Sequence, residues 1–472
     1  MGPRKNFVPS ENKYMNNQLP FSELTAISPL DGRYRSKVQD LAPFVSEYAL
    51  IKFRIEIEIK YLLALSEAGV TREFTNEEKQ KLQELIDMSF NDIKKVKEIE
   101  AETRHDVKAM ERTLRAHLEN TSLKDQLEMI HFGLTSEDVN NLSYRLILKR
   151  GTEQIIPAVE EIISSLSKWA EAYKETPMLA RTHGQAAVPT TIGKEMVNFA
   201  VRLHRQIVKL KKQKLTGKLN GAVGNFNALS FVYPNIDWLE FSEKFVSSLG
   251  FEPNLITTQI NQYDDVVEYL QNIQRINSIL IDFDQDMWRY VSDEWFVQVA
   301  KKGEVGSSTM PQKVNPIDFE NSEGNLGIAN GLIESLSRKL LISRLQRDLS
   351  DSTTIRNYGI ILGYSLVAYK STTTGIGRVS PNVDKIKNSL NKDWTILTEG
   401  VQTHLRKSKA NDPYSLISSL SRGEKVDEQK WEEWINNLSI SDEDKKQLSE
   451  LTPEKYIGLA VKLTEKALEE LK

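Results

Sequence analysis

The sequence predicts a mainly α-helical protein with a central bundle of long helices. Apolar residues recur at steps of three or four between residues 262 and 300, the spacing that lines one face of a helix. No proline occurs between Pro43 and Pro157, so nothing in that stretch breaks a helix. Strand-like and helical segments do not alternate, which argues against a parallel sheet. The apolar stripes of several long helices must be buried against one another or against neighbouring subunits.

Each expected helix follows from such a stripe. Residues 43–157 carry helical periodicity, and a further stripe starts at residue 191 and runs to residue 210. The stripe of residues 262–300 predicts one helix roughly 55 Å long at 1.5 Å per residue. Two more helices are expected, over residues 319–343 and 352–369. A short β-like run is expected over residues 229–233.

The chain has 472 residues, which at roughly 150 residues per domain predicts about three domains. Residues 1–20 are expected to be a disordered leader, because they are rich in Asn, Lys and Pro and cannot bury enough apolar surface. We place an N-terminal helical domain at 21–122 and the central long-helix bundle at 123–376. A C-terminal helical domain is expected at 377–472, since Pro381 ends the region of long helices.

Composition and charge exclude several classes of function. The 62 Lys and Arg nearly balance the 66 Asp and Glu, and the net charge of −4 argues against a nucleic-acid-binding protein. The absence of cysteine excludes disulfides, Fe–S clusters, thiolate zinc sites and a cysteine nucleophile. No run approaches the roughly 18 apolar residues of a membrane helix, and the first residues lack a signal-peptide core. We therefore expect a soluble, cytoplasmic protein that binds neither nucleic acid nor membranes.

Two further patterns are discounted as binding sites. Asp282, Asp284 and Asp286 have the spacing that opens a calcium loop, but they lie within a helical stripe and lack the glycine of such a loop. A solvated or capping role is expected for them. Three histidines in charged segments are expected to be surface residues rather than metal ligands: His117, His204 and His404.

Three polar segments that interrupt the helices are the candidate sites. They are residues 181–185, the Ser-, Gly- and Pro-rich residues 303–316, and residues 347–356. Loops carried on a rigid scaffold often hold catalytic groups, and residues 303–316 have the composition of a mobile lid. Ser352, at a helix start between two arginines, would suit a phosphate or carboxylate. The structural alternatives are a hydrogen-bonded histidine, an ordinary helix connection and a helix cap with solvated arginines.

The segment Gly306-Ser-Ser-Thr-Met-Pro-Gln-Lys-Val-Asn-Pro316 resembles the signature loop of the fumarase, aspartase and argininosuccinate lyase superfamily. Within that superfamily the chain resembles the adenylosuccinate lyase family in its longer bacterial-type form, from about Leu24 to the C-terminal end. The other motifs that carry this resemblance are Asp31-Gly-Arg-Tyr34, Thr135-Ser-Glu-Asp138, Arg181-Thr-His-Gly-Gln185, Pro316-Ile-Asp-Phe-Glu-Asn-Ser-Glu-Gly-Asn325 and Arg347-Asp-Leu-Ser-Asp-Ser-Thr353. Gln312 departs from the pattern, since close relatives often carry His there, and the loop alone also matches argininosuccinate lyases.

The resemblance implies a homotetramer whose central bundle is made of long helices and whose active sites are each built from three subunits. It also implies β-elimination of fumarate from adenylosuccinate to give AMP. The same reaction is expected with succinylaminoimidazole carboxamide ribotide (SAICAR), which gives AICAR in purine biosynthesis. No cofactor and no metal are expected, because general acid–base catalysis and electrostatic stabilisation suffice for this elimination.

The resemblance also assigns roles to residues that match the family's motifs. Ser307 is expected to be the catalytic base, with Ser308 as the alternative, and His183 the general acid that protonates the departing nitrogen. Lys313 and Asn315 are expected to stabilise the charge that develops on the substrate. The residues expected to hold the fumarate half are Thr135, Ser136 and Gln259. Those expected to hold the ribose and phosphate are Arg33, Tyr34, His105, Asp106, Arg347, Ser352 and Arg356.

Two alternatives stay open from the sequence. The first is argininosuccinate lyase or another fumarate-releasing lyase, which is distinguished by the substrate that yields fumarate. The second is a catalytically silent helical scaffold. The joint presence of His183, Ser307, Lys313 and Asn315 argues against a scaffold, because a scaffold does not need them.

Overall fold

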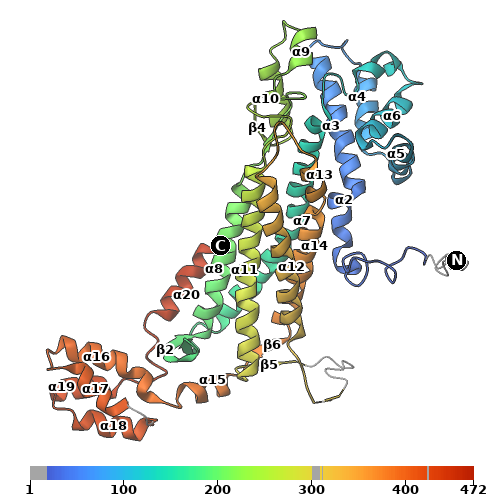
Figure 1. The fold of residues 1–472 in the computed structure, drawn as a ribbon. Helices are drawn as coiled ribbons and strands as arrows, with labels where there is room; N and C mark the ends of the chain where they lie inside the picture. The colour runs from blue at the N-terminus through green and yellow to red at the C-terminus, as the bar shows by residue number, and fades with distance from the viewer. Residues whose placement is uncertain (1–18, 300–308, 311, 422–424) are drawn as a thin grey trace, which may run out of the picture.

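A computed structural model of the chain describes residues 19–299, 309–310, 312–421 and 425–472, and it confirms the mainly α-helical fold. Most of the expected leader, residues 1–18, lies outside the described residues. Long helices run side by side in an elongated bundle (Figure 1). These helices are α7 (Ser136–Ala172), α8 (Ile192–Lys212), α11 (Asp264–Ser292), α12 (Ile317–Leu340) and α14 (Tyr358–Ile376).

The long helices form a closed ring of neighbours. Helix α7 packs against α8, α8 against α11, α11 against α12, α12 against α14, and α14 against α7 again. The apolar stripe predicted on residues 262–300 faces into this ring, where Ile273, Leu280 and Phe283 are buried. Burial of such stripes is the main favourable contribution to the stability of a helical bundle.

Polar groups are also buried inside the ring. The Tyr369 hydroxyl donates to Asn277 Oδ1 at 2.5 Å, and the Thr372 hydroxyl donates to Asp284 Oδ1 at 3.2 Å. Burial raises the pKa of Asp284 well above its usual range, because a charge is poorly solvated there. The expectation that Asp284 is solvated is therefore wrong: it lies within α11, as expected, but points into the core.

Helix α7 spans the length of the bundle. Its 37 residues measure roughly 55 Å at 1.5 Å per residue. Thr135 is its N-cap residue, and the Asp138 carboxylate accepts the Thr135 N–H at 2.9 Å, which satisfies a backbone donor at the helix start. Pro157 lies inside the helix without ending it.

The N-terminal region packs beside one end of the bundle. It contains α1 (Arg35–Val38), η1 (Gln39–Leu41), α2 (Ala42–Val45), α3 (Glu47–Glu67), α4 (Asn76–Ile86), α5 (Phe90–Thr103), α6 (Asp106–Leu118) and η2 (Ser122–Met129). One face of α3 joins α4, α5 and α6 in a hydrophobic cluster of its own, and another face packs on α7. At the same end, α9 (Asn227–Val232) and α10 (Trp238–Ser248) form the tip seen at the top of Figure 1.

The opposite end of the bundle carries short strands and the C-terminal helices. Strands β1 (Pro177–Thr182) and β2 (Gln185–Thr191) form an antiparallel hairpin, and β5 (Phe296–Gln298) pairs antiparallel with β6 (Val379–Pro381). A third pair, which is parallel, lies not at this end but beside α10, and it consists of β3 (Thr216–Gly217) and β4 (Glu252–Pro253). The C-terminal elements are α15 (Val383–Leu390), η3 (Trp394–Leu397), α16 (Thr398–Lys407), α17 (Pro413–Ser421), α18 (Glu428–Asn437), α19 (Asp442–Ser449) and α20 (Ala460–Glu470). Helix α20 returns to pack on α7 and α8 (Figure 1).

Several predicted boundaries are wrong. Helix α11 ends at Ser292, not near residue 300, because Glu294 adopts a left-handed conformation with φ of 60° and β5 follows. The run expected to be β-like, residues 229–233, belongs to helix α9 except for its last residue. The helix expected from Ser352 is interrupted, since α13 (Ser350–Ile355) ends two residues before α14 begins.

One discounted histidine also differs from expectation. His404 is mostly buried rather than on the surface, and its Nε2 lies 2.6 Å from Asp444 Oδ1.

No helix in the described part of the chain combines the length and apolarity that crossing a bilayer requires.

Candidate active site

The first turn of α7 brings together many of the predicted site residues. Thr135 and Ser136 begin the helix, where free N–H groups favour an anion. Two acidic residues follow directly, and both are buried. Each pairs with a cation from a distant segment: Glu137 with Arg347, and Asp138 with Lys218.

The ion pair between Glu137 and Arg347 fixes the predicted polar segment of residues 347–356 against α7. Arg347 Nη2 lies 3.1 Å from Glu137 Oε2 and 3.7 Å from Asp351 Oδ1. Burial raises the pKa of Glu137 to about 7, and the nearby charge of Arg347 offsets only part of that rise. The Tyr263 hydroxyl donates to Asp351 Oδ2 at 3.1 Å, which holds the acidic partner in place. Arg347 is thus engaged by carboxylates of its own chain.

Asp138 organises the backbone around Thr135. Besides the Thr135 N–H, its carboxylate accepts the N–H groups of Asn220 at 3.0 Å and Gly221 at 3.2 Å. Lys218 Nζ lies 3.2 Å from Asp138 Oδ1, and both side chains are fully buried. Residues 218–221 are therefore fixed against the start of α7.

Gln259 lies two residues after Thr257, which is hydrogen-bonded to Asn220. The Asn220 side chain exchanges hydrogen bonds with Thr257 Oγ1, at 2.8 and 3.1 Å. Gly224, with φ of 83°, passes so close to Thr257 that a Cβ there would lie 2.4 Å from the Thr257 carbonyl oxygen. These contacts connect Thr257 through Asn220 to the Asp138 carboxylate, which also accepts the Thr135 N–H.

His105 and Asp106 lie beside the second turn of α7. His105 is the N-cap residue of α6, and its Nδ1 accepts the Lys108 N–H at 3.2 Å. Arg54 joins the two helices, because its Nη2 lies 2.7 Å from Asp106 Oδ2 and its Nε donates to Asn140 Oδ1 at 2.8 Å. Burial opposes ionisation of Asp106, but the charge and hydrogen bond of Arg54 and the Val107 N–H together outweigh burial and lower the pKa of Asp106.

Arg356 connects this region with the Asp31-Gly-Arg-Tyr34 segment. A cavity of about 330 Å³ is lined by Arg356 together with Asp31 and Arg35, which flank Arg33 and Tyr34. The Tyr34 hydroxyl accepts a hydrogen bond from Asn321 Nδ2 at 3.1 Å. Ser352 is half-buried within α13, four residues before Arg356, which is the C-cap residue of that helix.

His183 lies at the opposite end of the bundle. Thr182 pairs with Gln185, so His183 and Gly184 are the two turn residues of the β1–β2 hairpin, with φ values of 53° and 73°. Residues 181–185 are thus a hairpin and not the expected loop. The base of the hairpin is tied to the C-terminal end of α7, since the Gly193 N–H donates to the Tyr173 carbonyl at 3.0 Å. The β1–β2 hairpin, which carries His183, therefore lies at the C-terminal end of α7, whereas Ser136 is the first residue of that helix.

Lys313 and Asn315 lie just before α12, at the same end as the hairpin. Arg378, which precedes β6, forms an ion pair with Asp318 at 3.0 Å and so fixes the start of α12 beside the β5–β6 strands. Lys313 is exposed and Asn315 half-buried. Ser307 and Ser308 lie outside the described residues. Within the described part of one chain, the residues around the start of α7 and those around the hairpin thus form two groups at opposite ends of the bundle. Tyr34 lies nearer the second group, because it bonds Asn321 in the second turn of α12.

His131 was missed in the sequence. It lies five residues before Ser136, has a φ of 59°, and its Nδ1 is 2.6 Å from Glu58 Oε1. Burial would lower the pKa of His131, but the hydrogen bond and charge of Glu58 outweigh burial and raise it. The left-handed backbone of a non-glycine residue close to a predicted site is a feature that only a structure reveals.

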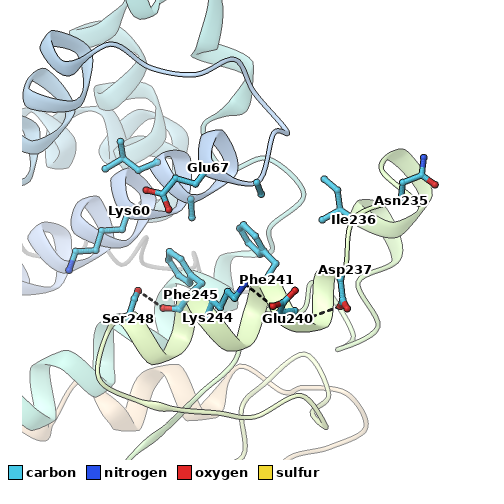
Figure 2. Close-up of a pocket in the computed structure, with 13 residues that line it drawn as sticks. Lys60, Glu67, Asn235, Ile236, Asp237, Glu240, Phe241, Lys244, Phe245 and Ser248 are labelled. Carbon is cyan, nitrogen blue, oxygen red and sulfur yellow. Dashed lines mark hydrogen bonds and ion pairs between the residues drawn. The ribbon is translucent and has the colours of Figure 1, made fainter.

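A groove of about 760 Å³ between α3 and α10 contains none of the predicted site residues. Figure 2 shows Phe241 and Phe245 of α10 pointing toward α3, with Lys60 and Glu67 on the other wall. The groove is lined by side chains of α3, of α10 and of the residues just before α10. It gives no separate indication of a catalytic site.

Comparisons with known proteins agree with the motifs in the site. Residues 32–331 match the family model described as Lyase, and residues 343–457 match the one described as Adenylosuccinate lyase C-terminal. The adenylosuccinate lyase of Haemophilus influenzae is 47% identical over 455 residues, which cover 95% of this chain and all of that protein. The chain belongs to the adenylosuccinate lyase family. The adenylosuccinate lyase of Escherichia coli K12 is 44% identical over 95% of this chain and 99% of its own length.

Solved structures agree on the fold. The fumarate lyase from Mesorhizobium sp. BNC1 superposes with a TM-score of 0.73 at 16% identity, over 91% of this chain and 97% of that one. At this identity the likeness concerns the fold alone.

Proposed function

We propose that this protein catalyses the β-elimination of fumarate from adenylosuccinate, which gives AMP, and from SAICAR, which gives AICAR. The full-length similarity to adenylosuccinate lyases carries this proposal, and the two hydroxyl residues at the start of α7, with Arg347 beside them, support it. Both substrates combine a dicarboxylate with a ribose phosphate, so both halves need anion-binding groups.

The proposed reaction has two proton transfers. Ser307, with Ser308 as the alternative, removes a proton from the carbon beside the succinyl β-carboxylate, and that electron pair forms the new C=C bond. The C–N bond breaks, the nitrogen keeps its bonding pair, and His183 supplies its proton. Lys313 and Asn315 stabilise the negative charge that accumulates on the carboxylate before the C–N bond breaks.

The remaining residues hold the substrate. Thr135, Ser136 and Gln259 bind the fumarate half, and the phosphate and ribose are bound by Arg33, Tyr34, His105, Asp106, Arg347, Ser352 and Arg356. Binding energy from the phosphate, remote from the bond that breaks, positions the reacting carbon. No metal ion or organic cofactor takes part in these steps.

We infer further that the protein acts in the cytoplasm as a homotetramer, with each site drawn from three subunits. The distance of roughly 55 Å along α7 between the two residue groups supports this inference, because one chain cannot bring them together. The outer face of α12 also supports it: Gly324, Gly327 and Gly331 have open space around them, and Ile328 is exposed. Glycines permit the close approach of a second backbone.

The decisive experiment follows the ultraviolet absorbance of adenylosuccinate mixed with purified protein and assays fumarate and AMP as products. Equal amounts of both products are expected from the wild type, and His183→Ala and Ser307→Ala should abolish them. Release of fumarate from argininosuccinate instead would assign the rival lyase activity. No product from either substrate would indicate a silent scaffold.

A further inference from the structure

Lys218 is a fully buried cation that has no role in the proposed reaction. Its ammonium group donates to the Gly221 carbonyl at 2.7 Å and lies 3.2 Å from Asp138 Oδ1. Burying a charged pair costs desolvation energy that the attraction between the charges often fails to recover, so such a pair is weak evidence of a stabilising role. Its place, between two segments of the proposed fumarate-binding set, points to another role.

The first connection runs from Lys218 to the start of α7. Asp138, the ionic partner of Lys218, also accepts the Thr135 N–H at 2.9 Å. The backbone of Lys218 is fixed to the same helix, because its N–H donates to Asn141 Oδ1 and its carbonyl accepts from Asn141 Nδ2, both at 3.0 Å. Lys218 therefore sets the position of Thr135 and Ser136 relative to residues 218–221.

The second connection runs from the same segment to Gln259. Asn220, held by the Asp138 carboxylate through its N–H, exchanges side-chain hydrogen bonds with Thr257. Thr257 is two residues before Gln259. A shift of residues 218–221 is thus transmitted to both sides of the proposed dicarboxylate pocket.

We infer that Lys218 is a positioning residue for the dicarboxylate half of the substrate, acting through Asp138 on Thr135 and Ser136 and through Asn220 and Thr257 on Gln259. This inference rests on the proposed function. The nucleotide half is held by arginines and by the His105–Asp106 segment, none of which contacts Lys218. Loss of Lys218 should therefore affect one half of the site selectively.

The test uses the two products as separate probes. Inhibition of adenylosuccinate cleavage by fumarate and by AMP is measured for the full-length wild type and for Lys218→Met, which removes the charge and keeps the chain length. We expect the inhibition constant of fumarate to rise at least tenfold while that of AMP stays within twofold. Equal weakening of both products, or unchanged fumarate inhibition, overturns the inference.

Two further variants make the test decisive. Arg150→Met removes another ion pair of α7, with Glu56 at 2.9 Å, roughly 21 Å along the helix from Ser136, and should change neither constant. If Lys218→Met does not fold, Thr257→Val decides, since it removes only the hydroxyl that bonds Asn220. It should weaken fumarate binding at least threefold without weakening AMP binding, and a failure to do so contradicts the inference. A wild type that does not cleave adenylosuccinate refutes the proposed function itself, whatever the variants do.

Discussion

The Arg347 guanidinium lies 3.1 Å from the buried carboxylate of Glu137, so the cation expected to bind phosphate is already held by an acid of its own chain. An arginine fixed on one side by a carboxylate is pre-organised to present its remaining N–H groups to a ligand. Glu137 is itself one residue from Ser136. Arg347 is therefore fixed to α7 by a carboxylate directly after Ser136.

Replacement of Glu137 by Gln should change the pH dependence of stability. The pKa of Glu137 is about 7 in the folded protein, above the usual 4.5, so its contribution is greatest at low pH and falls as pH rises toward 7. Between pH 5 and pH 8 the wild type should lose about 2.5 kcal/mol of unfolding free energy relative to Glu137→Gln. Denaturant titrations across this range measure the difference. Glu98→Gln, at an exposed position of α5, is the control and should follow the wild type.

Replacement of His183 by Asn should reduce catalysis and leave stability unchanged. Asn tolerates the positive φ of the hairpin turn, and the exposed His183 side chain has little packing to lose. Loss of the general acid should lower kcat by about 10²–10⁴-fold, with a thermal midpoint equal to that of the wild type. His204→Asn, on α8, is the matched control and should retain full activity. A His183→Asn enzyme with normal kcat would remove His183 from the mechanism.

Two inactive variants should restore activity when mixed. If His183 and Ser136 of one active site come from different chains, a reassembled 1:1 mixture of His183→Ala and Ser136→Ala contains sites with neither substitution. Random assembly predicts recovery of about a quarter of wild-type activity. Activity is measured after joint unfolding and refolding, with each variant refolded alone as the control. A mixed oligomer without activity would mean that both residues come from one chain.

Substitution of Gly331 by Ala tests whether this face of α12 is exposed to solvent or packed against a second chain. On an exposed helix the change should stabilise the protein by about 0.5–1 kcal/mol, because glycine loses more backbone freedom on folding. Against a second chain the added methyl group overpacks the contact and costs about 1–3 kcal/mol. We expect the second result, with a smaller mass in sedimentation equilibrium. A higher melting temperature with unchanged mass would argue that the face is free.

Long helices could be predicted from the sequence where they carry an apolar stripe, as α8 and α11 do, because such stripes are governed by local periodicity. Helix ends depend on single residues. The left-handed backbone of Glu294, two residues after the end of α11, could not be predicted, because glutamate is not a residue type that favours this conformation. The hairpin at His183 was missed for a similar reason, since His-Gly is not one of the Asn-Gly or Asp-Gly pairs that mark a two-residue hairpin turn. The domain boundaries at residues 122 and 376 stay predictions.

The candidate site was predicted as a set of residues but not as an arrangement. Motifs indicated Thr135, Arg347 and His183, because residue types at fixed spacing carry a family's chemistry. The pairing of Lys218 with Asp138, 80 residues apart, could not be inferred, since neither residue has a local pattern that names its partner. The separation of His183 from Ser136 became evident only when the path of α7 was known.

The closed ring of helices restricts how the length of this chain can change during evolution. Inserting one residue into α7 would advance everything beyond it by 1.5 Å and rotate it by about 100°. Each neighbouring helix would then need a matching insertion, because α8 and α14 contact α7 and close the ring through α11 and α12. Tolerated insertions and deletions should therefore gather in α16–α19, which lie outside the ring, while the bundle helices keep a fixed number of turns.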